Sequence, residues 1–459
     1  MYKGEAPLAQ ALFSYAEKQR ASFHTPGHKG HASPLDRLRL LEHDLTELPD
    51  TGSLFDGDDV IEEAEKRAAS AFGASETLFS AGGCTLCIQS MLFTGAGSGS
   101  QVLMARNAHR SAVNAAALLG LDPVWCWPEM NGTYHPITPG QIDEQLKKHN
   151  KIQSVYITSP DYYGNLCDIA GIAEVCRQHG ATLLVDNAHG SHLGAFGRHP
   201  LHLGADMTAD SAHKTLPVLT GGAYWHLSTQ AARHLSRPAA KAAMALFGST
   251  SPSFPVLASL DLARAWWEQE GPAAYRKTAE WAAAIRCAAM ESAAAGQGLD
   301  VAFRELAEMD RDPARLTLRV PAGQGEAAAS WFRLQGCEPE MADEENVVFI
   351  LTPFNTQSEM TRLEKAVRDY RPLSNGSFGD AAFSPAPPPF RPEKVCTPRE
   401  ALRHPFEGIP VGESVGRIAA RAVCPCPPGV AAVVPGERVD RQLAQWLLRR
   451  GVATLAVVK

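Results

Sequence analysis

The segment 205–222, ADMTADSAHKTLPVLTGG, places a single lysine, Lys214, between a polar cluster and an apolar run. Short apolar stretches flank it, and such stretches predict buried strands. Segments with apolar residues at helical spacing separate these strands, as in 60–73, where Gly73 is the expected stop, and in 168–180. The alternation predicts an α/β fold with a mostly parallel sheet covered by helices. The six expected strands lie in 77–83, 101–105, 123–127, 152–158, 181–186 and 222–227.

The overall composition and charge predict a cytoplasmic protein with a small-molecule partner. The 459-residue chain is 45% hydrophobic and 20% charged, with a formal net charge of −7. It has no basic block or Arg/aromatic stripe, so we expect no nucleic-acid partner. No run of 18 uncharged apolar residues predicts a membrane span, and the first 20 residues carry charges where a signal peptide needs an apolar core.

The ten cysteines are scattered, which predicts reduced thiols rather than a disulfide framework. Cys84 with Cys87, and Cys424 with Cys426, could suggest zinc. Their spacings do not match structural zinc ligands, and the first pair lies in a glycine-rich turn. We therefore expect no metal site.

Changes in composition along the chain predict several domains. Alanine-rich helical segments over 256–295 and strand-like runs at 314–320 and 346–352 predict a smaller α+β domain after the large one. The stretch 371–395 is rich in Pro, Gly and Ser and reads as a linker. We expect an N-terminal arm (1–30), a large domain (31–260), a small domain (261–375), a linker (376–395) and a C-terminal module (396–459).

Three polar clusters lie at or near strand ends: SAGGCT (80–85), VDNAHGSH (185–192) and DSAHK (210–214). In α/β sheets, ligands bind where strands end. A glycine-rich turn that leads into a helix can hold a phosphate. Asp186 can pair with a pyridinium nitrogen, and a partly desolvated lysine can attack a carbonyl to form a Schiff base. Together the clusters predict a pyridoxal 5′-phosphate site around Lys214.

Nine motifs in order resemble the pyridoxal-phosphate-dependent ornithine/lysine/arginine decarboxylase family, which has the aspartate-aminotransferase fold (fold type I). The resemblance runs from about Phe23 to Glu437, includes the C-terminal module and fits compact bacterial members without an N-terminal receiver-like domain. The motifs are FHTPGHKG, DLTELPDTGSLFD, LMARNAHRSAVNA, ITSPDYYG, VDNAHGSHLGAF, DSAHKTLPVLT, STSPSFPVLASLD, PEMAD and PCPPGVAAVVPGE.

The resemblance implies roles for individual residues. Lys214 would carry the cofactor, Asp186 would keep the pyridine nitrogen protonated, and His109 would stack on the ring. Lys214 or His213 would return a proton to the substrate carbon after loss of CO2. A homodimer, or an assembly of dimers, is implied, in which Thr250 and Ser251 reach the partner's site. Gly83, Cys84, Thr85, Ser211 and His213 would hold the phosphate, with His189 near the ring oxygen.

The chain departs from the family pattern at three places. Asn187 stands where an acid is usual, AGGCT replaces an NGTS-type turn, and Gly221 with Gly222 replaces Gln and Thr. These departures leave two alternatives open: another pyridoxal-phosphate reaction, such as an aminotransferase or lyase reaction, or a non-catalytic regulatory homologue.

The sequence leaves the substrate open among arginine, lysine and ornithine. Candidates to bind its distal basic group are Glu340, Asp343, Glu344 and Glu437. Asp161 is either an added substrate contact or, as we expect, a turn-forming residue. His192, His199 and His202 are expected to be ordinary structural or surface histidines.

Overall fold

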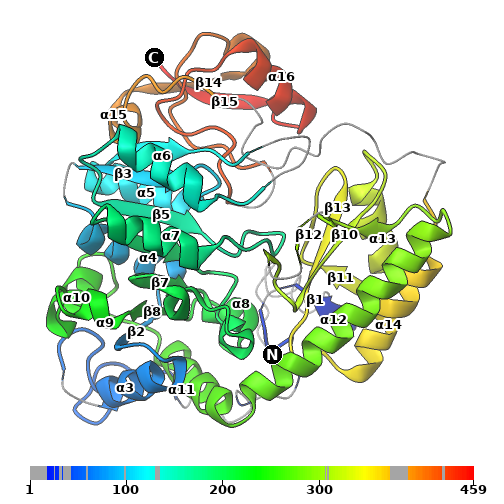
Figure 1. Cartoon of the computed structure of the whole chain (residues 1–459), viewed down its shortest axis with the longest axis horizontal. Helices are drawn as coiled ribbons and strands as arrows, with labels where there is room; N and C mark the ends of the chain where they lie inside the picture. The colour runs from blue at the N-terminus through cyan, green and yellow to red at the C-terminus, as the bar shows by residue number, and fades with distance from the viewer. Residues whose placement is uncertain are drawn as a thin grey trace, which may run out of the picture.

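The computed structural model contains a seven-stranded sheet, a smaller four-stranded sheet and a C-terminal module (Figure 1). It describes residues 18–459 except 25, 30, 32–33, 35–42, 58–59, 98–99, 130–134, 305, 308–309, 373–390 and 426–428. In these described residues, no helix is long and apolar enough to cross a membrane.

The large sheet has the order β2-β8-β7-β6-β5-β3-β4, and only β8 runs antiparallel to its neighbours. The mostly parallel α/β sheet and all six expected strands are therefore confirmed. The sequence did not predict β7, because this strand has only four residues and ends in an acid. The strands are β2 (Glu76–Ser80), β3 (Gln101–Ala105), β4 (Asp122–Cys126), β5 (Ser154–Thr158), β6 (Thr182–Asp186), β7 (Met207–Asp210) and β8 (Ala223–Leu227).

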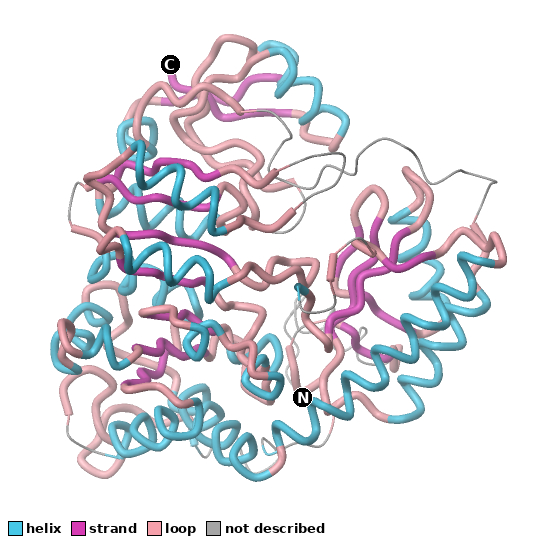
Figure 2. Tube along the Cα trace, in the orientation of Figure 1, coloured by secondary structure: helices cyan, strands magenta, loops and turns pink. Residues whose placement is uncertain are grey.

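Helices cover both faces of this sheet (Figure 2). Side chains alternate along β5, so that Tyr156 packs with one apolar cluster while Val155 and Ile157 pack with another. On the first face lie α4 (Gly83–Gly95) and α5 (Arg110–Leu119), and on the second α6 (Pro139–Lys148) and α7 (Ile169–Gln178).

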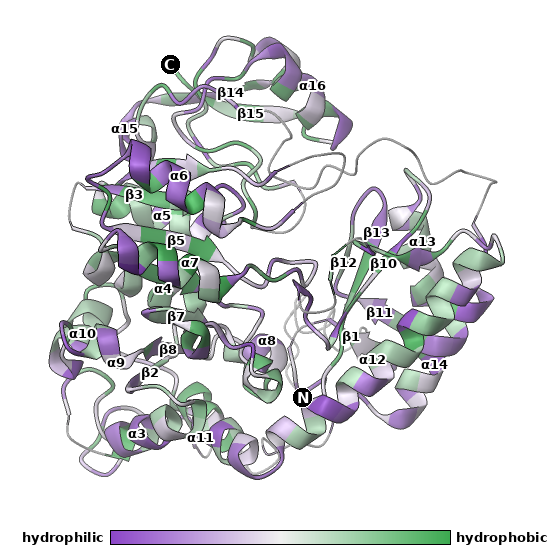
Figure 3. Cartoon of the chain, viewed as in Figure 1, coloured by the Kyte–Doolittle hydropathy of each residue, from purple (hydrophilic) through white to green (hydrophobic). Residues whose placement is uncertain are grey.

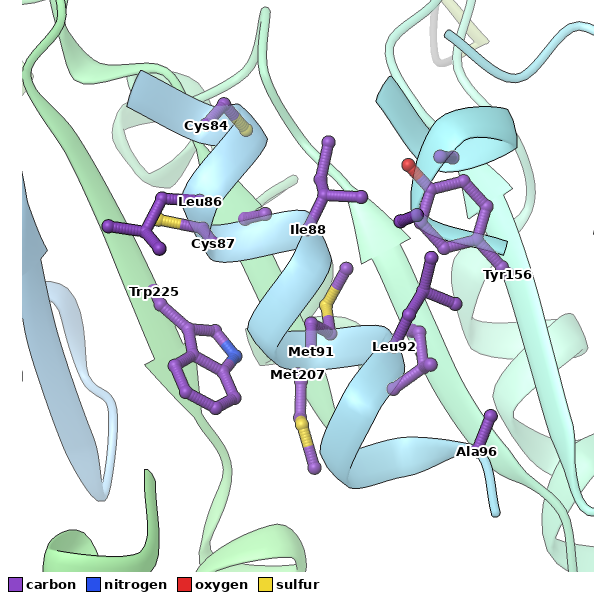
Figure 4. Close-up of a cluster of buried hydrophobic side chains, with 14 of the residues drawn as sticks. Cys84, Leu86, Cys87, Ile88, Met91, Leu92, Ala96, Tyr156, Met207 and Trp225 are labelled. Atoms are coloured by element: carbon purple, nitrogen blue, oxygen red, sulfur yellow. The ribbon is translucent and has the colours of Figure 1, made fainter. Parts of the chain in front are cut away.

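Helix α4 shows how the sheet positions the site. Its buried side chains, including Met91 and Leu92, pack against Tyr156, Met207 and Trp225 of the sheet (Figure 4). This packing fixes the first turn of α4 beside the strand ends. The helix α3 (Val60–Phe72) ends at Gly73, whose φ of +67° confirms the predicted stop.

The small domain is built on α12 (Gly271–Ala294), which follows α11 (Phe254–Gln269) (Figure 1). Its four-stranded sheet has the order β12-β13-β10-β9, and the segment β1 (Ala21–Phe23), from the expected N-terminal arm, pairs with β11. The other elements are β9 (Asp300–Val301), β10 (Arg315–Arg319), α13 (Gly325–Leu334), β11 (Cys337–Pro339), β12 (Met341–Ala342), β13 (Asn346–Ile350) and α14 (Gln357–Asp369).

The C-terminal module forms its own core beside the antiparallel pair of β14 and β15, and its helix α15 packs against α5. The polar outer face of α16 contrasts with the apolar strands of the large sheet (Figure 3). Much of the expected linker lies outside the described residues, and the domain boundaries stay predictions. The elements are α15 (Pro398–Arg403), β14 (Phe406–Pro410), α16 (Arg441–Arg449) and β15 (Thr454–Val458).

Candidate active site

A cavity of about 250 Å³ lies at the carboxyl ends of β5 and β6, beside the first turn of α4. Nine of the eleven residues expected to bind the cofactor line it, although the sequence spreads them over more than 130 positions. The nine are Gly83, Cys84, Thr85, His109, Asp186, His189, Ser211, His213 and Lys214.

Asp186 ends β6 and is 1% exposed. Its Oδ2 accepts a hydrogen bond from the Tyr156 hydroxyl at 3.0 Å, and its Oδ1 accepts one from Ala188 N at 3.1 Å. Burial raises the pKa of this carboxyl, and the charge of Lys214 opposes the rise. The carboxylate is therefore held in a fixed orientation and needs a cationic partner.

Lys214 lies on the short helix α8 (Ala212–Thr215), which follows β7 directly. Its Nζ is 3.0 Å from His189 Nε2. Burial lowers the pKa of Lys214, while the charge of Asp186 works in the opposite direction. A partly buried amine with a lowered pKa is suited to act as a nucleophile.

The first turn of α4 presents backbone N–H groups to the cavity, because no side chain caps this helix. Gly83 has a φ of +68°, and its N–H donates to Gly221 O at 2.8 Å. A Cβ on Gly222 would lie 2.3 Å from Val218 Cγ1. The unusual glycines at 221 and 222 thus have a local packing reason beneath the turn that Gly83 begins.

His109 caps α5, with Nδ1 accepting from Ser111 N at 3.2 Å. Burial, with the charges of Lys214 and Arg110, lowers the pKa of His109 to about 4. The His213 pKa is also lowered to about 4, chiefly by burial, and its Nδ1 lies 3.1 Å from Gly222 O. Both rings are therefore neutral at neutral pH.

Asn187, which replaces the usual acid, belongs to a buried network behind the cavity. Its Nδ2 donates to Asp210 Oδ2 at 2.8 Å, and His199 Nε2 lies 2.9 Å from the same oxygen. Burial would raise the pKa of Asp210, but the His199 charge and hydrogen bond outweigh it and lower the pKa. His199, Asp210 and His226 are close enough to surround a metal ion, but His199 and Asn187 instead form hydrogen bonds with Asp210.

The cavity residues fit pyridoxal phosphate. The Thr158 hydroxyl lines the cavity, is buried and has no hydrogen-bond partner among the described residues, so the space is suited to a polar ligand. An uncapped helix start for a phosphate, a carboxylate for a ring nitrogen and an amine for an aldehyde are the three groups that this cofactor requires.

Thr250 and Ser251 are exposed and do not line this cavity. Within one chain they are therefore not brought to the site. Their assignment to a partner's site stays a prediction.

The expected acidic contacts for the substrate lie elsewhere. Glu340 accepts from the Tyr162 hydroxyl at 2.7 Å and Asp343 from the Tyr163 hydroxyl at 2.8 Å, and none of the four candidate acids lines the cavity. Glu437 as a substrate contact is wrong, because it is 1% exposed and forms an ion pair with Arg106 at 2.9 Å.

Asp161 has the turn role that we expected. Its Oδ1 accepts from Tyr163 N and from Asn165 N, each at 2.9 Å, although the residue also lines the cavity. The three expected structural histidines have partners within the fold. His192 binds Asp312, His199 binds Asp210, and His202 lies 2.8 Å from Phe72 O.

Several residues at the site were not singled out from the sequence, among them Val430, Tyr162 and Arg315. Val430 of the C-terminal module lines the cavity, Tyr162 packs its ring 4.7 Å from that of His189, and Arg315 of β10 reaches His189. Tyr162 lies in the quoted motif ITSPDYYG and Val430 in the quoted motif PCPPGVAAVVPGE, so both could have been singled out. Arg315 comes from a distant segment that no spacing in the sequence connects to Lys214.

Two models of the family described as "Orn/Lys/Arg decarboxylase" match the chain, the major domain over residues 6–359 and the C-terminal domain over 381–450. The chain is 30% identical to Bacillus subtilis YaaO (96% of this chain, 94% of YaaO) and 29% identical to the Bacillus subtilis arginine decarboxylase (100% and 96%). The Pseudomonas aeruginosa lysine decarboxylase A structure has a TM-score of 0.77 at 20% identity, covering 99% of this chain and 80% of that one.

Proposed function

The chain belongs to the Orn/Lys/Arg decarboxylase family of pyridoxal-phosphate enzymes, and we propose that it removes the α-carboxyl group of a basic amino acid as CO2 and releases the corresponding amine. The observation that carries the proposal is the shared cavity of Lys214, Asp186 and the uncapped start of α4. The bound cofactor supplies an electron sink for the carbon that loses its carboxyl group.

The chain's own residues bind, orient and protonate in this account. The first turn of α4 and Ser211 hold the phosphate, Lys214 provides the attachment point, and Asp186 keeps a proton on the ring nitrogen. His109 covers one face of the ring.

His213 or Lys214 returns a proton to the reacting carbon. The Gly222 carbonyl only accepts, so Nδ1 of the neutral His213 ring carries its proton and Nε2 is bare. Nε2 of His213 would therefore have to take up a proton before it could return one to the reacting carbon.

Arginine is the first substrate to test. Supporting this choice, the sequence matches the Bacillus subtilis arginine decarboxylase over nearly the whole of both proteins at 29% identity. The Pseudomonas aeruginosa lysine decarboxylase LdcA is 24% identical, and the match covers 74% of its length. Lysine and ornithine are the competing substrates.

The experiment incubates the purified chain with arginine, lysine and ornithine separately and measures CO2 and amine together. We expect equal amounts of both products from one substrate, and none from Lys214→Ala. A keto acid without CO2 would instead identify an aminotransferase, and no product from any of the three would favour a non-catalytic homologue.

We also propose a homodimer, or an assembly of dimers, in which Thr250 and Ser251 complete the partner's site. The exposed hydroxyl-rich loop before Pro252 supports this. Lys214→Ala and Thr250→Ala/Ser251→Ala are each expected to be inactive and to regain activity when refolded together, since one hybrid site is then intact. No recovery despite demonstrated subunit exchange would contradict the shared site.

A further inference from the structure

Three side chains, Arg315, His189 and Lys214, contact one another in order and connect the small domain to the reactive amine. Arg315 Nη2 lies 3.2 Å from His189 Nδ1, and His189 Nε2 lies 3.0 Å from Lys214 Nζ. Arg315 is 4% exposed and His189 is 5% exposed, so bulk water does not compete for these contacts. Which atoms of these three side chains can donate and which can accept therefore determines where the protons lie.

The proton positions follow from the chemistry of the guanidinium group, which has five donors and no acceptor. His189 Nδ1 must therefore accept, and a histidine that accepts at Nδ1 carries its proton at Nε2. That N–H points to Lys214 Nζ, which must then accept through its lone pair. An ammonium group at Lys214 would face an N–H donor and has no lone pair to offer.

We propose that Arg315 is a positioning residue that locks His189 as the neutral Nε2–H tautomer, and that this tautomer holds Lys214 as the neutral, nucleophilic amine. The proposal concerns the chain's own protons and does not depend on which amino acid is the substrate. It extends the roles expected for Lys214 and His189 by adding a third residue from another domain.

The structure holds Arg315 firmly in this position. Its Nη1 donates to Tyr162 O at 3.0 Å, and its Nε is 3.9 Å from Asp312 Oδ2. Gly164, at φ +91°, leaves room for the side chain, since a Cβ there would lie 2.6 Å from Arg315 Cγ. The guanidinium cannot move away from His189 without losing these contacts.

Burial and the neighbouring positive charges favour the neutral forms of His189 and Lys214. Burial and the charges of Lys214, Arg315, His109 and His213 lower the His189 pKa well below its usual value. Burial and Arg315 lower the pKa of Lys214, against Asp186, Cys84 and Glu340, which raise it. A neutral imidazole beside a neutral amine agrees with the hydrogen-bond order.

The first test reads the tautomer directly. The cofactor-free full-length chain is labelled with ¹⁵N-histidine, and the signal of His189 is assigned by its loss in His189→Leu. We expect a bare Nδ1 and a protonated Nε2 at neutral pH. A proton on Nδ1, alone or in an imidazolium, would overturn the proposal.

The second test reads the amine. Cyanate carbamoylates neutral amines, so the rate at Lys214, followed by peptide mass spectrometry against pH, gives the midpoint of its titration. In Arg315→Met we expect this midpoint to rise by about one pH unit, which slows the reaction about tenfold at neutral pH. Arg315→Lys, which retains a donor, should behave like wild type.

Two controls separate the tautomer from simple charge. Arg319→Met, on the same strand but paired with Glu345, should leave the midpoint unchanged. In a His189→Leu background, Arg315→Met should shift the titration midpoint of Lys214 much less than in wild type, because the imidazole that connects Arg315 to Lys214 is absent. An equal shift in both backgrounds would show that Arg315 acts only through its charge and would overturn the proposal.

Discussion

The small domain and the C-terminal module meet the same edge of the large sheet in different ways. The small domain makes polar side-chain contacts, as Arg315 binds His189 and Asp312 binds His192 at 2.8 Å. The C-terminal module makes backbone contacts, since Arg110 N donates to Gly429 O at 2.6 Å and Val430 forms a bridge with His109.

This difference separates two tasks. One of the small-domain contacts, that of Arg315, ends on His189, whose Nε2 lies 3.0 Å from Lys214 Nζ, so it can influence the chemistry of the amine. The C-terminal contacts hold a segment against His109, backed by the buried pair of Arg106 and Glu437, so they fix the position of a ring. Changes to the module should therefore alter geometry and stability, and changes in the small domain should alter proton states.

The largest effect is expected at Glu437. Glu437→Leu leaves the buried Arg106 without its carboxylate, and breaking such a pair costs roughly 3–5 kcal/mol. Hydrogen exchange of the C-terminal peptides measures this loss as easier opening of the module. Glu393→Gln, which breaks the exposed pair with Arg438, is the control and should cost less than about 1 kcal/mol. Equal losses of stability in the two variants would contradict the expected difference between the buried and the exposed ion pair.

A smaller effect on stability but a clear effect on turnover is expected at Gly429. Its φ is +81°, and a Cβ there would lie 2.0 Å from His109 Nε2, so Gly429→Ala must displace the ring. We expect kcat to fall roughly 10- to 100-fold. Gly451→Ala has a similar φ of +75° and no atom within 4 Å of the new Cβ, so it tests backbone strain alone. If both variants lower kcat equally, the contact with His109 has no special role.

The smallest effect is a difference in pH dependence between the two contacts. His109 has a folded pKa of about 4 against 6.5 when unfolded, so the unfolded state binds the proton first and stability falls as the pH drops from 6.5 towards 4. For Asp312, the charge and hydrogen bond of His192 outweigh burial and lower the pKa.

The Asp312 contribution is therefore complete above about pH 4, its unfolded pKa, and is lost only at lower pH. Hydrogen exchange at pH 7, 5 and 3.5 should show the peptides around His109 opening first and those of β10 later. Simultaneous opening would mean that neither group controls its own contact.

The sequence was sufficient to predict the large sheet and most of the site. Its strands are short apolar runs, and the cofactor residues follow strand ends, where the carboxyl edge of a parallel sheet brings them together. The strand β7 was not predicted, because its sequence MTAD has too few apolar residues to be distinguished from a loop.

The contacts between domains could not be predicted in the same way. Arg315 is 126 positions from His189, and Glu437 is 331 positions from Arg106. Local patterns do not reveal which distant segments meet. In the sequence, a buried and ion-paired acid such as Glu437 also cannot be told from an acid that binds a substrate. Only the folded chain distinguishes the two.

The most direct test of the account asks whether Lys214 carries the cofactor. Purified protein is reduced with borohydride, digested and mapped by mass spectrometry. We predict one pyridoxyl group, on the peptide that contains Lys214, and no reducible adduct in Lys214→Ala. A pyridoxyl group on another lysine, or an unchanged adduct in the variant, would contradict the account.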